Sequence, residues 1–345
     1  MSVISSPHTH SPASLDKVML QVVYAIIPAI LIHAWSFGWG VITNQIFMII
    51  TALLAESVVL YLRRRPVSST LKDGSALVTA MLLGLSLPPA SPLWLLIVGG
   101  IAAIVLAKHL YGGLGFNPFN PAMVGYVVVL ISFPVEMTTW QSPLSISSEE
   151  TLSFLSTLIY VVQGSLPVSI SIDTLTQATP LDHIKTGISL NQTVSEMRSS
   201  GSVFGHVSGH GWEMTNLVVM LGGIWMIYKG IIRWHVPVAM LSTIVVFSSV
   251  FYLIDNSRFA DPLFHLFSGG AMLGAFFIAT DPVTCATSTK GRIIFGVGAG
   301  MIVFIIRVWG GYPDGNAFAV LLMNMAAPTI DYYTKPRILG QRGKS

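Results

Sequence analysis

The chain has 345 residues, of which 52% are hydrophobic and only 10% are charged. Soluble domains carry about a quarter charged residues, so this composition excludes an ordinary soluble domain and indicates that lipid is the solvent. The net charge of +3 is scattered between apolar runs, which argues against a nucleic-acid partner, and the single cysteine excludes an intrachain disulfide.

About ten apolar stretches are predicted to be membrane-spanning or half-spanning helices. A hydrocarbon core of roughly 30 Å requires about 20 apolar residues in a helix, and helices satisfy the backbone polar groups that lipid cannot. We therefore expect an all-α polytopic membrane protein without a cleavable signal before its first helix. In chain order the stretches are 18–37, 41–62, 75–87, 93–111, 121–135, 214–231, 235–254, 268–280, 292–309 and 316–331.

The positions of Lys and Arg predict how these helices are oriented. If the N-terminus is cytoplasmic, fourteen of the 18 basic residues lie in cytoplasmic segments, and only Lys185, Arg198, Arg258 and Arg307 do not. The positive-inside rule then places both termini in the cytoplasm. The one long loop, residues 136–213, becomes periplasmic. A loop of this length is usually either functional or disordered, and its content of Ser, Thr and Gly alone favours disorder.

The two halves of the sequence resemble each other. A short apolar run, 75–87, ends at a Pro-Pro pair, and a second short run, 268–280, ends at Asp281-Pro282. Each is followed by a long span, a Gly-Gly pair, an asparagine and another apolar run. Because each half holds five spans, the second copy must enter the membrane inverted. Thirteen residues of helix reach only about 20 Å, so we expect half-spanning helices with a buried site between the halves; the alternative is two ordinary helices with different ends.

This pattern divides the chain into five parts. They are a cytoplasmic tail (1–17), a first five-helix repeat (18–135), a periplasmic loop (136–213), a second, inverted repeat (214–331) and a second cytoplasmic tail (332–345).

The long loop contains the polar segment Asp173-Thr-Leu-Thr-Gln-Ala-Thr-Pro-Leu181. Proline at 180 pushes Thr179 towards an extended conformation, which leaves its hydroxyl exposed. Taken alone, the segment is a solvated turn or a helix cap.

A resemblance gives the same segment a further meaning. The pattern Asp-x-x-Ser/Thr-x-Ala-Thr, followed by Pro-Leu, is similar to the motif at which a flavin transferase links FMN to threonine through a phosphodiester. It occurs in the D-type member of Rnf complexes and in the B-type member of the sodium-pumping NADH:quinone reductase. Asp173, Thr176, Ala178 and Thr179 match the motif, whereas Gln177 stands where the family usually has glycine.

Three further stretches resemble the same family, and the resemblance covers about residues 17–337. They are 112–122 (GGLGFNPFNPA), 279–284 (ATDPVT) and 310–315 (GGYPDG).

The resemblance implies a complex that passes electrons between NADH and ferredoxin-like carriers while moving Na⁺ or H⁺. This chain would be a relay subunit with covalent FMN on Thr179 and a second, non-covalent flavin, riboflavin, in the bundle. Its partners would be the other Rnf subunits, above all a flavoprotein G-type subunit and small membrane subunits. A flavin transferase would act on it during maturation.

Five polar residues inside or beside the apolar stretches are candidates for a second flavin site or an ion path: Glu56, Asn117, Asn120, Thr280 and Asp281. A carboxylate in a membrane helix is neutral unless it is paired or hydrated. For Glu56 the alternative is therefore a neutral helix contact. For the Asn-containing turns the alternative is tight packing, and for Asp281 it is a helix cap.

Other polar residues have simpler interpretations. Arg307 lies near an outer helix end, where its side chain is expected to snorkel to the interface. Lys108-His109 at an inner end is expected to anchor its helix at the interface. His206 and His210 are too few ligands for zinc, and no metal site is expected.

Two other classes of function remain open. One is a channel or secondary transporter without redox function, with a fold of the urea-transporter type. The other is the B-type member of the sodium-pumping reductase, which normally has a longer N-terminal extension than the 17 polar residues found here. A purely structural scaffold is a third interpretation.

Overall fold

The computed structural model describes residues 15–147, 152–166 and 175–334. Within these residues the regular structure is helical apart from one two-stranded antiparallel ribbon. The ribbon pairs β1 (Trp140–Gln141) with β2 (Thr176–Gln177).

Four helices are long and apolar enough to cross a membrane. The other helices that match expected stretches are shorter or less apolar, so length and composition identify a multi-pass membrane protein but only four of its crossings. The four are α1 (Leu15–Phe37), α2 (Trp39–Leu62), α13 (His235–Ile254) and α16 (Thr289–Trp309). The others are α4 (Ser75–Ser86), α5 (Leu93–Ile101), η1 (Ala102–His109), α6 (Pro121–Ser132), α12 (Trp212–Tyr228), α15 (Ala271–Leu273), η2 (Gly274–Ile278) and α17 (Asn316–Thr334).

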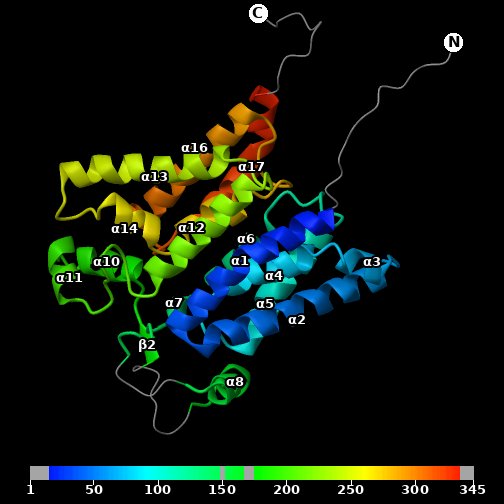
Figure 1. Ribbon diagram of the computed structural model, residues 1–345, viewed down its shortest axis with the longest axis horizontal. Helices are drawn as coiled ribbons and strands as arrows, with labels where there is room; N and C mark the ends of the chain where they lie inside the picture. The colour runs from blue at the N-terminus through cyan, green and yellow to red at the C-terminus, as the bar shows by residue number, and fades with distance from the viewer. Residues whose placement is uncertain (1–14, 148–151, 167–174, 335–345) are drawn as a thin grey trace, which may run out of the picture.

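The helices form an N-terminal group and a C-terminal group that lie side by side (Figure 1). Helices α1, α2, α4, α5 and α6 make up the first group, and α12, α13, α16 and α17 surround α15 and η2 in the second. The groups meet where α1 packs on α12 and where α6 packs on α17. A single apolar core runs through both groups.

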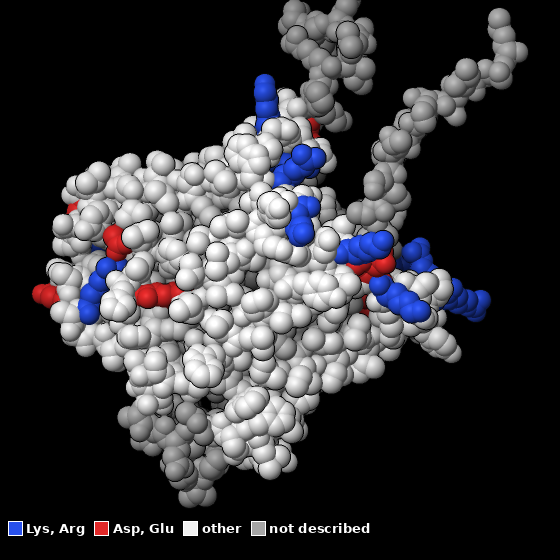
Figure 2. Space-filling model, viewed as in Figure 1, with Lys and Arg blue, Asp and Glu red and all other residues white. Residues whose placement is uncertain are grey.

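Charged side chains lie at the two ends of the molecule, with a broad uncharged band between them (Figure 2). Lys and Arg gather at the end where α1 begins and α17 ends. The uncharged band is the surface that a hydrocarbon core requires.

The two short segments are short helices, as expected. Helix α4 stops at Ser86, and the amide of Asn44 on α2 donates to Pro88 O (2.7 Å) and accepts from Ser91 N (3.2 Å). In the second half, α15 and η2 together cover only residues 271–278, and Asn216 on α12 donates to Phe267 O and Gly269 O. A helix that stops inside the bundle leaves backbone groups without intrahelical partners, and buried asparagines supply those partners.

The described part of the long loop is folded, so the expectation of disorder was wrong there. Its helices α10 and α11 share a small core of their own with residues next to and within α14. The Ser and Thr residues that suggested disorder include three helix N-caps, Ser153, Thr179 and Thr193, which accept hydrogen bonds from the first turns of their helices. The helices of the loop are α7 (Pro134–Thr138), α8 (Phe154–Gln163), α10 (Pro180–Ser189) and α11 (Val194–Ser200). Two further short helices lie outside it: α3 (Val67–Leu71), which follows α2, and α14 (Pro262–Phe267), which follows α13.

Arg307 does not snorkel to the interface, contrary to the expectation. Its side chain is 1% exposed, and its Nε donates to Asp314 Oδ1 (3.1 Å) while its other nitrogens donate to His265 O and Ser268 O. Burial raises the pKa of the Asp314 carboxyl, but the Arg307 guanidinium and hydrogen bonds from Gly270 and Asn316 lower it by more, so Asp314 stays ionised. The pair ties the end of α16 to the break between α14 and α15.

We expect Arg307→Met to destabilise the protein strongly, by about 3–5 kcal/mol, because it removes the cation that pairs with Asp314 and leaves two backbone carbonyls without their donor. Arg258→Met, at an exposed position, is the control and should change the stability little. Thermal unfolding of the purified protein in detergent measures both. Equal unfolding temperatures for the two variants would contradict this role of Arg307.

Candidate functional site

Thr179 caps the start of α10. Its backbone is extended (φ −65°, ψ 158°), as Pro180 requires, and its Oγ accepts a hydrogen bond from Asp182 N (3.2 Å). The helix-cap interpretation of this threonine is therefore confirmed. The side chain is partly exposed, so the hydroxyl is held in one place and is still accessible.

The residues before Thr179 are held by the β-ribbon. Thr176 and Gln177 form β2, and their partners in β1 are Gln141 and Trp140, respectively. Ala178 follows the strand directly and is partly buried. Asp173 lies outside the described residues, so its part in the motif stays a prediction.

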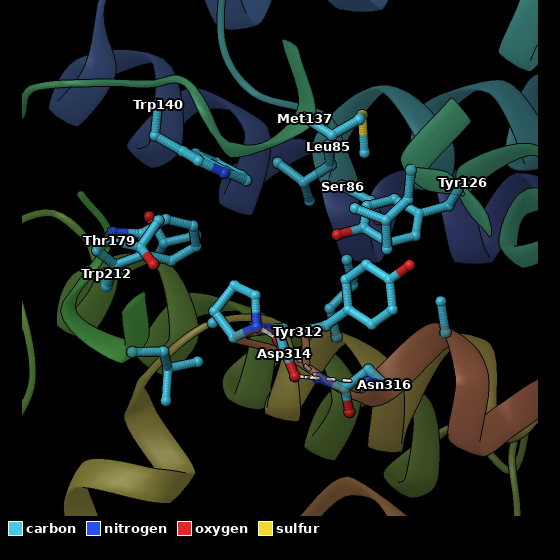
Figure 3. Close-up of a pocket in the computed structure, with 18 of the residues that line it drawn as sticks. Leu85, Ser86, Tyr126, Met137, Trp140, Thr179, Trp212, Tyr312, Asp314 and Asn316 are labelled. Carbon is cyan, nitrogen blue, oxygen red and sulfur yellow. Dashed lines mark hydrogen bonds between the residues drawn. The ribbon is translucent and has the colours of Figure 1, made fainter. Parts of the chain in front are cut away.

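Thr179 borders a cavity of about 110 Å³ between the two groups of helices. Figure 3 shows Trp140 and Trp212 on the same side of it as Thr179, with Tyr126, Met137, Leu85 and Ser86 on the side of the N-terminal helices. Tyr312, Asp314 and Asn316 close it from the C-terminal group. We call it the Thr179 cavity.

A buried site between the two halves of the chain was expected, but little in the sequence pointed to the residues that line this cavity. Its aromatic residues come from β1, α6, α12 and the turn before α17, which are distant in the chain. Of these residues only Tyr312 belongs to a motif that the sequence singled out, the GGYPDG segment, which also contains Asp314. Spacing along one chain cannot show that four separate elements converge.

Lys185 ties α10 to the C-terminal group of helices, and Asp182 of the same helix lines the cavity. The Lys185 ammonium donates to Tyr312 O (2.6 Å) and Ile306 O (3.0 Å), at the end of α16. Burial lowers the pKa of Lys185, although Asp182 and Asp314 oppose this effect. Burial raises the pKa of Asp182, which lines the cavity, against the opposing charges of Lys185 and His183.

The Asn and Asp residues predicted for a second site do meet. Asn120 N donates to Asn324 Oδ1 (3.0 Å), and Asn120 Nδ2 lies 3.4 Å from Asp281 Oδ2. These contacts join the N-terminal to the C-terminal group beside a second cavity of about 100 Å³, which Asn117, Asn120, Thr280 and Asp281 all line. We call it the Asp281 cavity. Asn324 was not predicted, because a lone asparagine in an apolar helix carries no motif.

Asp281 caps a turn rather than a helix. Its carboxylate accepts from Val283 N (3.1 Å) and from the Thr284 hydroxyl (3.2 Å). Asn117 similarly closes its own turn by donating to Phe119 O (3.0 Å). Both residues therefore shape the backbone, and both present polar atoms beside the cavity.

Glu56 is not an isolated carboxyl. It is fully buried, with Lys108 Nζ at 2.5 Å and His109 Nε2 at 3.1 Å from its Oε1. The Lys108 ammonium also donates to Ser75 Oγ (2.7 Å). Lys108 and His109 were expected to anchor a helix at the interface, and that expectation was wrong because both side chains are buried. The cluster adjoins the Asp281 cavity through Lys108, which lines it.

Known proteins resemble this chain over its whole length. The model of the NQR2, RnfD, RnfE family matches residues 2–340. The D-type member of the ion-translocating oxidoreductase complex of Vibrio atlanticus is 48% identical over 345 residues, which cover 98% of this chain and 99% of the relative. The proteins of the same name from Erwinia tasmaniensis and Escherichia coli O127:H6 are each 45% identical over 347 residues, covering 99% of this chain and 98% of each relative.

We expect Lys108→Met to destabilise the protein by about 3–5 kcal/mol, because it leaves the Glu56 charge buried without its cation. The double variant Glu56→Gln/Lys108→Met removes both charges and should recover much of that loss. Thermal unfolding in detergent of Lys108→Met, of Glu56→Gln and of the double variant measures the coupling between the two sites. If the two single effects simply add in the double variant, the ion pair does not hold these helices together.

Proposed function

The chain belongs to the NQR2, RnfD, RnfE family, and from this premise we propose that it is the membrane subunit of an Rnf-type ion-translocating oxidoreductase complex with FMN linked to Thr179. One observation carries the proposal. The threonine of the acceptor motif stands at the edge of an aromatic cavity between the two helix groups. The name borne by the relatives, which makes them part of an ion-translocating oxidoreductase complex, supports the same function.

The residues around Thr179 fit an FMN group linked by its phosphate. A phosphodiester on the Thr179 oxygen would lie at the N-terminus of the ten-residue helix α10, where the helix dipole favours an anion. The walls supplied by Trp140, Trp212, Tyr126 and Tyr312 suit a planar ring. When bound, the flavin supplies transfer of one or two electrons, and the protein positions it and sets its surroundings.

The Asp281 cavity is the proposed place of the second flavin, riboflavin, or of the ion path. Its support is the set of buried hydrogen-bonding groups from both helix groups: Asn117, Asn120, Thr280 and Asp281, with Glu56 joined to it through Lys108. Polar groups in a membrane bundle are costly and mark functional paths.

The proposed orientation places both termini in the cytoplasm and the loop that bears Thr179 in the periplasm of a bacterial inner membrane. The gathering of Lys and Arg at the end where α1 begins supports it (Figure 2). The two helix groups, 18–135 and 214–331, are proposed to be inverted five-helix repeats. Electrons would be exchanged with a flavoprotein subunit of the complex on the periplasmic side, and a flavin transferase would load Thr179.

A channel or transporter without redox function is the second candidate. The half-length helix α4 and the pair α15–η2 favour it, because broken helices at matching positions are typical of transporters. Detection of a covalent flavin on the chain would distinguish the redox subunit from the transporter.

We expect Thr179→Val to abolish covalent flavin, because valine has no hydroxyl to esterify. The experiment expresses the chain with its flavin transferase and reads flavin fluorescence of the denatured protein in a gel. Thr186→Val is the matched control, since Thr186 is an exposed threonine of the same helix, and it should retain the full signal. Mass spectrometry of the peptide across residues 173–185 locates the modification.

A wild-type chain that carries no flavin in native membranes, with the transferase present, would overturn the proposal and favour the transporter. Fluorescence retained in Thr179→Val would place the flavin on another residue.

A further inference from the structure

His33 brings a polar nitrogen without a partner to the wall of the Thr179 cavity. This histidine of α1 is 2% exposed and lines the cavity together with Thr215 and Trp212. Its Nδ1 lies 3.2 Å from Thr215 Oγ1, whereas its Nε2 is buried and has no hydrogen-bond partner among the described residues. A buried polar group left unpaired lowers stability, so a partner that binds in the cavity and donates to Nε2 would remove this penalty.

The hydrogen bonds of Thr215 identify which nitrogen of His33 carries the proton. The single hydroxyl hydrogen of Thr215 is donated to Gly211 O, 2.8 Å away at the start of the same helix. The Thr215 oxygen can then only accept from His33, so Nδ1 is the protonated nitrogen. In the neutral ring Nε2 is left as a bare acceptor. The group that the site lacks is therefore a hydrogen-bond donor.

Aromatic contacts join this acceptor to the attachment site. The His33 ring centroid lies 5.8 Å from that of Trp212, and the Trp212 centroid lies 4.9 Å from that of Trp140. Trp140 is in turn the β-ribbon partner of Gln177, two residues before Thr179. One wall of the cavity thus runs from the threonine to the histidine.

The amide groups of the cavity wall cannot supply the missing donor. The amide group of Asn216 donates to the backbone carbonyls of Trp212, in its own helix, and of Phe267 and Gly269, outside it. Those of Asn316 are donated to the Asp314 carboxylate. No other group of the described residues donates to His33 Nε2 either, so we assign the donor to a group bound in the cavity.

We propose that His33 Nε2 accepts a hydrogen bond from the ring N–H that the flavin on Thr179 carries only in its reduced form. This inference rests on the proposed function. Reduction of the ring by two electrons with uptake of two protons would convert two bare ring nitrogens into N–H groups, and His33 would accept from one of them. A fixed acceptor beside such a nitrogen would accept a hydrogen bond from the reduced ring. Beside the oxidised ring the same acceptor would face a lone pair, which is unfavourable. His33 is in this sense a positioning residue that favours the reduced flavin, and Thr215 holds it in the required tautomer.

The test compares variants of the full complex purified from membranes and measures the midpoint potential of the covalent flavin by spectroscopic titration. We expect His33→Leu to keep the covalent flavin but to lower its potential by up to about 30 mV, which corresponds to a tenfold loss in preference for the reduced form of a two-electron couple. His33→Gln retains an acceptor oxygen and should stay near the wild-type value. Thr243→Val is the control, because Thr243 is a buried threonine that donates to Ala239 O on its own helix and does not line the cavity.

An unchanged potential in a flavin-loaded His33→Leu complex overturns the role of His33 and leaves the proposed function intact. Absence of flavin from the wild-type complex overturns the proposed function itself. If His33→Leu does not assemble, Thr215→Val decides. It keeps the imidazole but removes the oxygen that fixes its tautomer, so a lower potential supports the inference and an unchanged one overturns it.

Discussion

A polar group without a partner in lipid costs several kcal/mol, and this constraint governs where the helices of the protein can stop. Helix α4 stops where Asn44 takes up the backbone groups of the following turn. At the break before α15, Asn216 donates to the carbonyls of Phe267 and Gly269. Asn324 of α17 accepts from Asn120 N, in the turn before α6, and donates to Thr284 O, in the turn after η2. Each of these asparagines is buried. The short helices are therefore stable features of the bundle rather than frayed ends of longer ones.

The same breaks create the places where chemistry can occur. The Thr179 cavity and the Asp281 cavity both lie where the N-terminal and C-terminal groups meet. Polar and ionic groups fix the parts around them, with the Arg307–Asp314 pair at one end and the Glu56–Lys108 pair at the other. A ligand placed in either cavity would contact both groups of helices, so a change in its charge would act on both at once.

The class of fold and the short segments could be predicted well from the sequence, because a helix in lipid needs an apolar surface along its whole length, and this shows directly in composition and hydropathy. The extended backbone at Thr179 was predictable too, because Pro180 imposes it. No pattern could show that Glu56 meets Lys108 and His109, which lie 52 and 53 residues away in the chain. Nor could His33 be found, since one histidine in an apolar helix has no pattern. The interfacial roles assigned to Arg307 and Lys108 were wrong because a position near a helix end was equated with exposure. Lys108 is buried against α2 and α4, and Arg307 is buried against α14 and the turn before α17.

The roles proposed for the residues of the Thr179 cavity all depend on where the flavin lies, and a density map of the complex purified from native membranes tests that directly. We expect continuous density from the Thr179 oxygen through a phosphate to a planar ring that lies between Trp212 and the α6 side of the Thr179 cavity. A cavity without ring density, or a flavin joined to a different residue, would contradict this position.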